Sequence, residues 1–168
     1  MAYTSRKFAP GAPNVKVARF TTGKSRQDYD YLLQLVSEGR VQIRHNALEA
    51  ARVAANKKLT PLGEENYYLR VVTYPFSILR ENKLIATAGA DRLQEGMRKA
   101  FGKPIGLAAR VEVGSSILEI SIKAENLEKA KEALHSARAK LPVKTKIAVV
   151  PLQRQQPAEV PAQPPPSA

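Results

Sequence analysis

The chain has 168 residues, and its 27 Lys and Arg against 15 Asp and Glu give a formal net charge of +12 at pH 7. It holds no cysteine, which excludes disulfides and thiolate metal sites. No stretch is long and apolar enough to predict a membrane span or a signal peptide. An excess of positive charge of this size favours an anionic partner, and nucleic acid is the first candidate. We therefore expect a protein of the cytoplasm that binds a polyanion and needs neither a metal nor a cofactor.

The N-terminal stretch, residues 1–27, is basic and contains no acidic side chain. Pro10 and Pro13 restrict its backbone and oppose a helix. This stretch is either a disordered tail or an extended arm that becomes ordered along RNA. The counterions that each neutralised phosphate releases favour the arm. The candidate RNA-binding residues of this arm are its cations: Arg6, Lys7, Lys16, Arg19, Lys24 and Arg26.

The next segments predict two strands and a helix. Residues 29–36 alternate imperfectly between apolar and polar side chains and residues 41–45 alternate cleanly, so we expect two strands that are joined by a short turn and pair with each other. A helix is predicted over residues 47–59, with Asn46 as its N-cap and Glu49 three residues later, a variant of the capping box. Its apolar face is mostly alanine, which permits close packing on a sheet.

Four more strands are predicted before the second helix. Residues 66–75 are rich in β-branched and aromatic side chains, which favours a strand, and residues 76–82 resemble another short strand. Residues 105–114 and 115–123 also alternate, and the Gly-Ser step between them indicates a β-hairpin.

An amphipathic pattern predicts the second helix over residues 124–140, and alternation predicts a last strand over residues 143–150. The fold class is therefore expected to be α+β, a two-layer domain over residues 28–150 with a mostly antiparallel sheet and two helices. Residues 151–168 are rich in proline and poor in bulky apolar groups, so they are expected to be a disordered tail. A docking role for this tail stays open.

The internal loop, residues 89–104, is the stretch best suited to function. Connections longer than about 12–15 residues are uncommon in compact domains and are usually functional or disordered. The loop combines glycines with the cations Arg92, Arg98, Lys99 and Lys103, a composition that suits docking against phosphates and stacked bases. The alternative is a short structural helix, because Leu93, Met97 and Phe101 recur at intervals of four residues.

Side chains that could support catalysis or metal binding are sparse. His45 and His135 have no cysteine and no acidic cluster beside them, so each is expected to be a surface or partly packed imidazole. Glu64 and Glu65 form a carboxylate pair in a turn, without the surroundings of a general acid. We expect no catalytic residue, no metal site and no small-molecule substrate.

The loop sequence carries a family resemblance. GADRLQEGMRKAFGKP followed by GLAARVEVG, with ALEAARVAANKKL upstream, resembles the universal large-subunit ribosomal protein family called L-ten-e in archaea and eukaryotes and L-sixteen in bacteria. The arm fits as well, through AYTSRKFAPGAPNVKVARFTTG. The resemblance covers residues 2–123 and is strongest between Asn46 and Gly114. The form of the loop indicates the archaeal or eukaryotic type.

This resemblance implies an α/β-hammerhead fold and a structural role in the large ribosomal subunit, in translation. It implies binding to 23S-type rRNA near the 5S rRNA region and the A-site tRNA, among neighbouring ribosomal proteins, and support of tRNA accommodation. The internal loop would point toward the peptidyl-transferase centre. The loop residues that the resemblance marks for RNA are Arg92, Gln94, Met97, Arg98, Lys99, Phe101 and Lys103.

Two alternatives to this interpretation stay open. The first is a free-standing RNA chaperone or regulatory RNA-binding protein that uses the same surface. The second is an enzyme that acts on an anionic substrate through Glu64 and Glu65 or through His45. The first alternative keeps the RNA partner and differs from the ribosomal interpretation in how firmly the chain stays with the large subunit.

Overall fold

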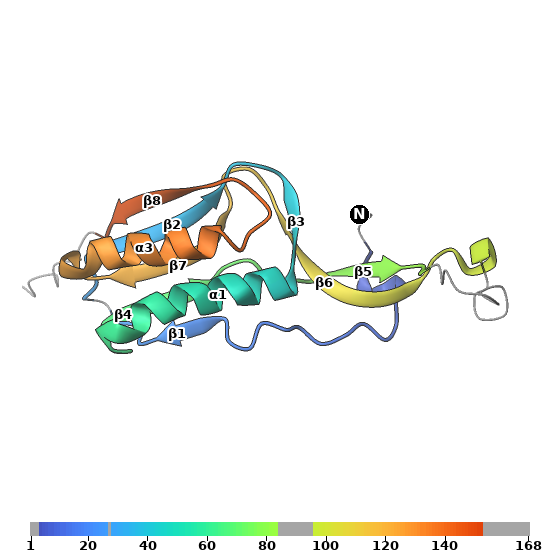
Figure 1. The fold of residues 1–168 in the computed structure, drawn as a ribbon, viewed down its shortest axis with the longest axis horizontal. Coiled ribbons are helices and arrows are strands. Elements are labelled where there is room, and N and C mark those ends of the chain that lie inside the picture. The colour runs from blue at the N-terminus through green and yellow to red at the C-terminus, as the bar shows by residue number, and fades with distance from the viewer. Residues whose placement is uncertain (1–3, 27, 84–95, 153–168) are drawn as a thin grey trace, which may run out of the picture.

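The computed structural model describes residues 4–26, 28–83 and 96–152 (Figure 1). These described residues confirm the α+β class, with two α-helices and two antiparallel sheets among them. Arg92, Gln94 and residues 153–168 of the tail lie outside the described residues.

The larger sheet has five strands in the order β1-β4-β7-β2-β8. Every neighbouring pair is antiparallel. Alternation places one row of side chains on the same face: Leu33 and Leu69 both lie opposite Ile120, and all are fully buried. Burying a side chain of this size stabilises the fold by roughly 1.5–3 kcal/mol. The strands are β1 Thr21–Gly23, β2 Tyr31–Ser37, β4 Tyr67–Val71, β7 Ser116–Ile122 and β8 Thr145–Pro151.

Both helices cover the same face of this sheet and pack on each other (Figure 1). They are α1, His45–Leu59, and α3, Leu127–Arg138. The buried stripe of α1 contains small alanines, as predicted, and that of α3 contains them as well, so the small side chains let the helices approach each other and the sheet closely. Short 3-10 turns lie beside these helices: η2 Thr60–Leu62 follows α1, and η4 Ala124–Asn126 precedes α3.

The smaller sheet has the order β3-β6-β5 and carries the internal loop. Its strands are β3 Val41–Arg44, β5 Ser77–Glu81 and β6 Lys103–Val111. β5 and β6 pair as the two arms of a hairpin that extends away from the helices, and the internal loop connects their far ends (Figure 1). One end of the loop is the 3-10 turn η3, Gly96–Lys99. The described part of the loop, from Gly96 onward, therefore lies at a distance from the helices (Figure 1).

Two predicted strand pairings are wrong. β2 and β3 lie in different sheets, and so do β6 and β7. Instead, β2 pairs with β7 and β3 pairs with β6, so both chain segments pass from one sheet to the other at the same place. Backbone hydrogen bonds join the two crossings: Ser37 N donates to Ser115 O at 2.9 Å and Gly114 N donates to Ser37 O at 2.9 Å.

The predicted N-cap of the first helix is also wrong. α1 begins at His45, one residue before Asn46, and its N-cap residue Arg44 makes no side-chain capping bond. Within the part of the chain that the structure describes, the side chain of Asn46 accepts from the adjacent Ala47 N alone, at 3.2 Å. Glu49 is not free to complete a capping box, because its carboxylate accepts from Arg52 and from the backbone N of Ala18.

The described part of the N-terminal arm packs along the body. Its 3-10 turn η1, Arg6–Phe8, lies beside the smaller sheet, and β1 extends the larger one (Figure 1). Ile78 N donates to Thr4 O at 3.0 Å, and Val71 N donates to Phe20 O at 2.7 Å. These contacts favour an ordered arm over a disordered tail.

Candidate RNA interface

The cations of the arm divide into an exposed group and a paired group. Lys24 and Arg26 both reach Glu65, with N–O distances of 3.4 Å and 2.6 Å. Ion pairs near the surface contribute about 0–1 kcal/mol, so a phosphate can replace this carboxylate at little cost. The other predicted arm residues have exposed side chains: Arg6, Lys7, Lys16 and Arg19.

The described end of the internal loop is open to solvent. Met97 is 84% exposed, and Arg98 and Lys103 are also exposed. Lys99 lies in η3 with Arg98, so the described part of the alternative structural helix is a single 3-10 turn. Arg92 and Gln94 lie outside the described residues, so their predicted roles stay predictions.

Arg80 on β5 joins the start of the arm to the end of the loop. Its Nε donates to Thr4 Oγ1 at 2.8 Å, and its Nη1 donates to the backbone O of Phe101. The guanidinium carbon lies 3.7 Å from the centroid of the Phe101 ring, a cation–π contact. Phe101 is still 49% exposed, so part of its ring remains accessible to a base. Sequence reasoning missed Arg80, because it occupies an ordinary polar position of a predicted strand.

Gly102 fixes where the loop returns to the sheet. Its φ is +75°, a conformation that side chains with a Cβ rarely adopt. A Cβ at this position would lie 2.5 Å from the backbone carbon of Glu81. Glycine is therefore required here, both for its backbone angle and for the close approach to β5. We call Thr4, Arg80, Phe101 and Gly102 the loop anchor.

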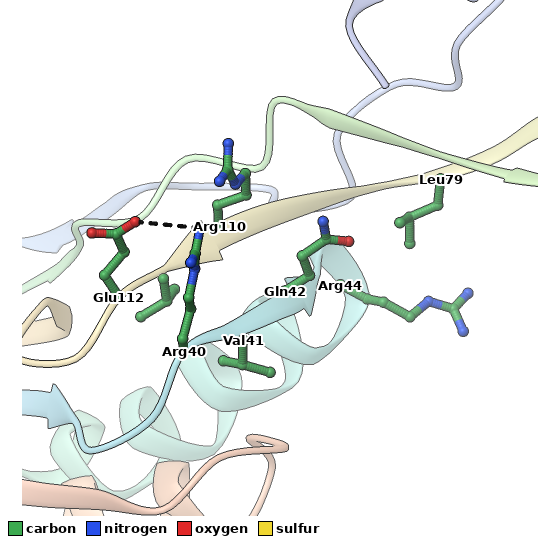
Figure 2. Close-up of a pocket in the computed structure, with 8 residues that line it drawn as sticks. Arg40, Val41, Gln42, Arg44, Leu79, Arg110 and Glu112 are labelled. Carbon is green, nitrogen blue, oxygen red and sulfur yellow. Dashed lines mark ion pairs between the residues drawn. The ribbon is translucent and has the colours of Figure 1, made fainter. Parts of the chain in front are cut away.

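A groove lies on one face of the smaller sheet, with a volume of about 560 Å³. Gln42 lies directly opposite Arg110 in the β3–β6 ladder, and Arg40 and Glu112 follow at the end of the same pair of strands (Figure 2). Arg40 Nη2 lies 3.9 Å from Glu112 Oε1, and both side chains are 72% exposed. The lining residues are Arg40, Val41, Gln42, Arg44, Leu79, Arg110, Val111 and Glu112, and we call this site the arginine groove.

Sequence reasoning also missed the arginine groove. Arg44 and Arg110 each stand at a polar position of an alternating segment, which is where any solvated cation is expected. Only the pairing of β3 with β6 brings them to one face, and the two predicted local hairpins do not include that pairing. Because cross-strand partners are the units that build such a face, a wrong partner hides the site.

His45 links the arm to the base of α1. The imidazole is buried, and its Nδ1 accepts from the backbone N of Lys16 at 3.3 Å. Burial lowers the pKa of His45, and the nearby charges of Lys16 and Arg44 lower it further. A neutral ring is therefore favoured, as the accepting Nδ1 requires. This histidine has a structural role, and it is more buried than the sequence indicated.

Among the described residues, no group of three or more His, Cys, Asp or Glu side chains is placed to hold a metal ion. In the same part of the chain, no helix has the length and apolar character needed to cross a membrane. The geometry that remains is cationic: an arm, a loop end and a groove.

Comparison with known proteins adds the family. The model for the family described as Ribosomal protein L16p/L10e matches residues 2–148. The chain belongs to this family. Its relatives include three archaeal proteins named large ribosomal subunit protein uL16. That of Hyperthermus butylicus is 52% identical over 154 residues, covering 91% of this chain and 86% of the relative. That of Staphylothermus marinus is 53% identical over 152 residues, covering 90% of this chain and 87% of the relative. That of Metallosphaera sedula is 50% identical over 157 residues, covering 92% and 90%.

Membership of the L16p/L10e family confirms the resemblance in the loop and arm, and the archaeal relatives agree with the type that the loop indicated. It also confirms the expectation that the chain is not an enzyme, since the family is one of ribosomal proteins. In this L16p/L10e protein the arm and the loop are not separate appendages. The loop anchor holds the start of one beside the end of the other.

Proposed function

We propose that this chain is a structural component of the large ribosomal subunit in the cytoplasm. In this role it binds 23S-type rRNA near the 5S rRNA region, contacts neighbouring ribosomal proteins and supports accommodation of the A-site tRNA. Its family and the names of its relatives support the ribosomal assignment. The formal net charge of +12 supports an RNA partner, because neutralised phosphates release counterions.

The loop anchor is the observation that carries the finer part of the proposal. It ties a basic arm and the base of a cationic loop together at the outer end of the β5–β6 hairpin. Exposed cations from both segments can therefore bind one RNA surface while the loop reaches beyond it. Such a device positions the loop mechanically, and catalysis is not needed for it to promote tRNA accommodation.

Co-sedimentation separates this function from that of a free RNA chaperone. A structural component stays with the large subunit as KCl is raised to moderate concentrations, whereas a chaperone is washed off. Large subunits from which the chain has been removed, and to which it is then restored, provide the control for specific binding. Loss of the restored chain at low salt would contradict the proposal.

The loop is tested by the double variant Arg98→Ala and Lys99→Ala. We expect the variant to fold and to enter the large subunit, yet to slow A-site tRNA accommodation in a reconstituted translation assay. The matched control is the pair Arg138→Ala and Lys140→Ala, which removes the same charge from exposed positions at the end of α3. Unfolding of the loop variant in isolation would show that the loop is structural instead.

A further inference from the structure

We propose that the arginine groove binds a ribose-phosphate strand of folded RNA. This inference rests on the proposed function, and it adds a binding site that lies outside both the arm and the internal loop. The groove is lined mainly by β3 and β6, and β6 is also one arm of the hairpin that presents the loop, so an RNA that contacts the loop end can continue along β6 to the groove.

The charges in the groove favour phosphates. Three of the lining side chains are arginines, Arg40, Arg44 and Arg110, and one is acidic, Glu112. A guanidinium offers a planar set of donors that matches two phosphate oxygens at once. In an extended backbone, positions four residues apart are separated by about 13 Å, so Arg40 and Arg44 can reach different phosphates of one strand. Figure 2 shows Arg44 extending away from the Arg40–Glu112 pair.

In the structure, the carboxylate of Glu112 pairs with the guanidinium of Arg40. Its carboxylate lies 3.9 Å from Arg40, at the outer limit of an ion pair, and both side chains are largely exposed. A pair of this kind contributes little to stability. A phosphate can therefore replace Glu112 as the partner of Arg40 without destabilising the fold. The displaced carboxylate of Glu112 then repels the bound phosphate. Removal of the Glu112 charge should strengthen RNA binding for this reason.

Gln42 is the lining residue that suits a sugar. The two apolar lining residues offer little surface, because Leu79 is 3% exposed and Val41 packs against the main core. Gln42 supplies an acceptor, because its side-chain oxygen is buried and has no hydrogen-bond partner among the described residues. Buried acceptors are usually satisfied, so an unpaired one indicates a missing donor. Rotation of the Gln42 amide toward a ribose 2′-hydroxyl breaks no hydrogen bond of that oxygen. An acidic protein segment would supply anions but no such hydroxyl.

The test measures binding of the full-length chain to a transcript of the large-subunit rRNA as a function of salt. Arg44→Gln and Arg110→Gln together should weaken binding at least about tenfold, and should reduce the slope of log K against log salt by about 0.7–0.9 for each phosphate that the variant no longer neutralises. The control pair Arg138→Gln and Lys140→Gln removes the same charge at the end of α3 and should leave the slope unchanged.

Two further variants test the groove without removing a cation. Glu112→Gln should strengthen rRNA binding by about threefold at low salt, because one repulsive charge is removed. Gln42→Leu should weaken binding to an RNA hairpin and leave binding to the DNA hairpin of the same sequence unchanged, since only RNA carries the 2′-hydroxyl. Circular dichroism of each variant checks that the fold is retained.

The outcomes separate this inference from the proposed function. If the wild-type chain binds the rRNA and the groove variant matches the Arg138 and Lys140 control, the groove inference is overturned and the proposed function stands. It is also overturned if the groove variant keeps its rRNA affinity and loses binding to poly-glutamate, which would make the occupant an acidic protein segment. If the wild-type chain shows no preference for the rRNA over DNA of equal length, the proposed function itself fails.

Discussion

Replacement of Arg80 by methionine tests the loop anchor. Arg80→Met keeps much of the apolar stem and removes the guanidinium, and with it the hydrogen bonds to Thr4 and Phe101 and the cation over the ring. Hydrogen bonds that involve a charged group contribute about 1.5–3 kcal/mol each, and an exposed cation–π contact adds about 0.5–1 kcal/mol. Because Arg80 is only partly buried, water replaces part of what is removed. We therefore expect the free energy of unfolding to fall by about 2 kcal/mol.

Urea denaturation of the full-length chain measures this decrease, and hydrogen exchange at Gly102 and Lys103 reports whether the end of the loop is released. The control Arg138→Met places the same substitution on an exposed helical position, where the expected change is within about 0.5 kcal/mol. A double-mutant cycle that combines Arg80→Met with Thr4→Val measures the coupling free energy between the arm and β5. If Arg80→Met changes the unfolding free energy no more than the control does, and exchange is unaltered, the loop anchor has no mechanical role.

The other predictions concern the backbone and pH. Gly102→Ala should destabilise the fold by more than about 1 kcal/mol in urea denaturation, because φ is +75° and the new Cβ meets backbone. Gly11→Ala is the control, because Gly11 has a φ of +77° but open space around it, so this substitution adds backbone strain without a steric clash. If Gly102→Ala and Gly11→Ala reduce the stability equally, the clash of the new Cβ with the backbone at position 102 is contradicted. The pKa of His45 is lowered in the folded state, so the unfolded state binds more protons and stability should fall as pH decreases from about 6.5. His45→Asn removes this part of the pH dependence; a pH profile unchanged by the substitution would refute it.

The elements were largely predictable because their signals are local. Alternation and helical periodicity placed both helices, and the strands other than β1, within a few residues of their observed bounds. β1, Thr21–Gly23, lies in the predicted arm and was not predicted as a strand. The pairing of the strands was not predictable in this way. The segments around Ser37 and Gly114 look like hairpin turns, yet each carries the chain between sheets, and only their contact with each other decides this. Local sequence contains no record of that contact.

The candidate site was predictable in part, for the same reason. Exposed cations of the arm and loop stand out in the composition, and Phe101 stands out as the one aromatic ring of the loop. Arg80 does not, because its role depends on Thr4, which lies 76 residues away in the chain. The arginine groove depends likewise on the register of β3 with β6. Sites made by one segment can be predicted from composition, whereas sites made by two require the fold.

Directed cleavage of rRNA tests most directly the claim that the loop is presented to RNA. The chain contains no cysteine, so Met97→Cys provides a single attachment point for an iron chelate at a side chain that is 84% exposed. Hydroxyl radicals generated there in assembled large subunits should cleave the rRNA around the peptidyl-transferase centre, and a chelate at Arg138→Cys should give a different pattern. Absence of rRNA cleavage from position 97, in subunits that contain the labelled chain, would contradict the account.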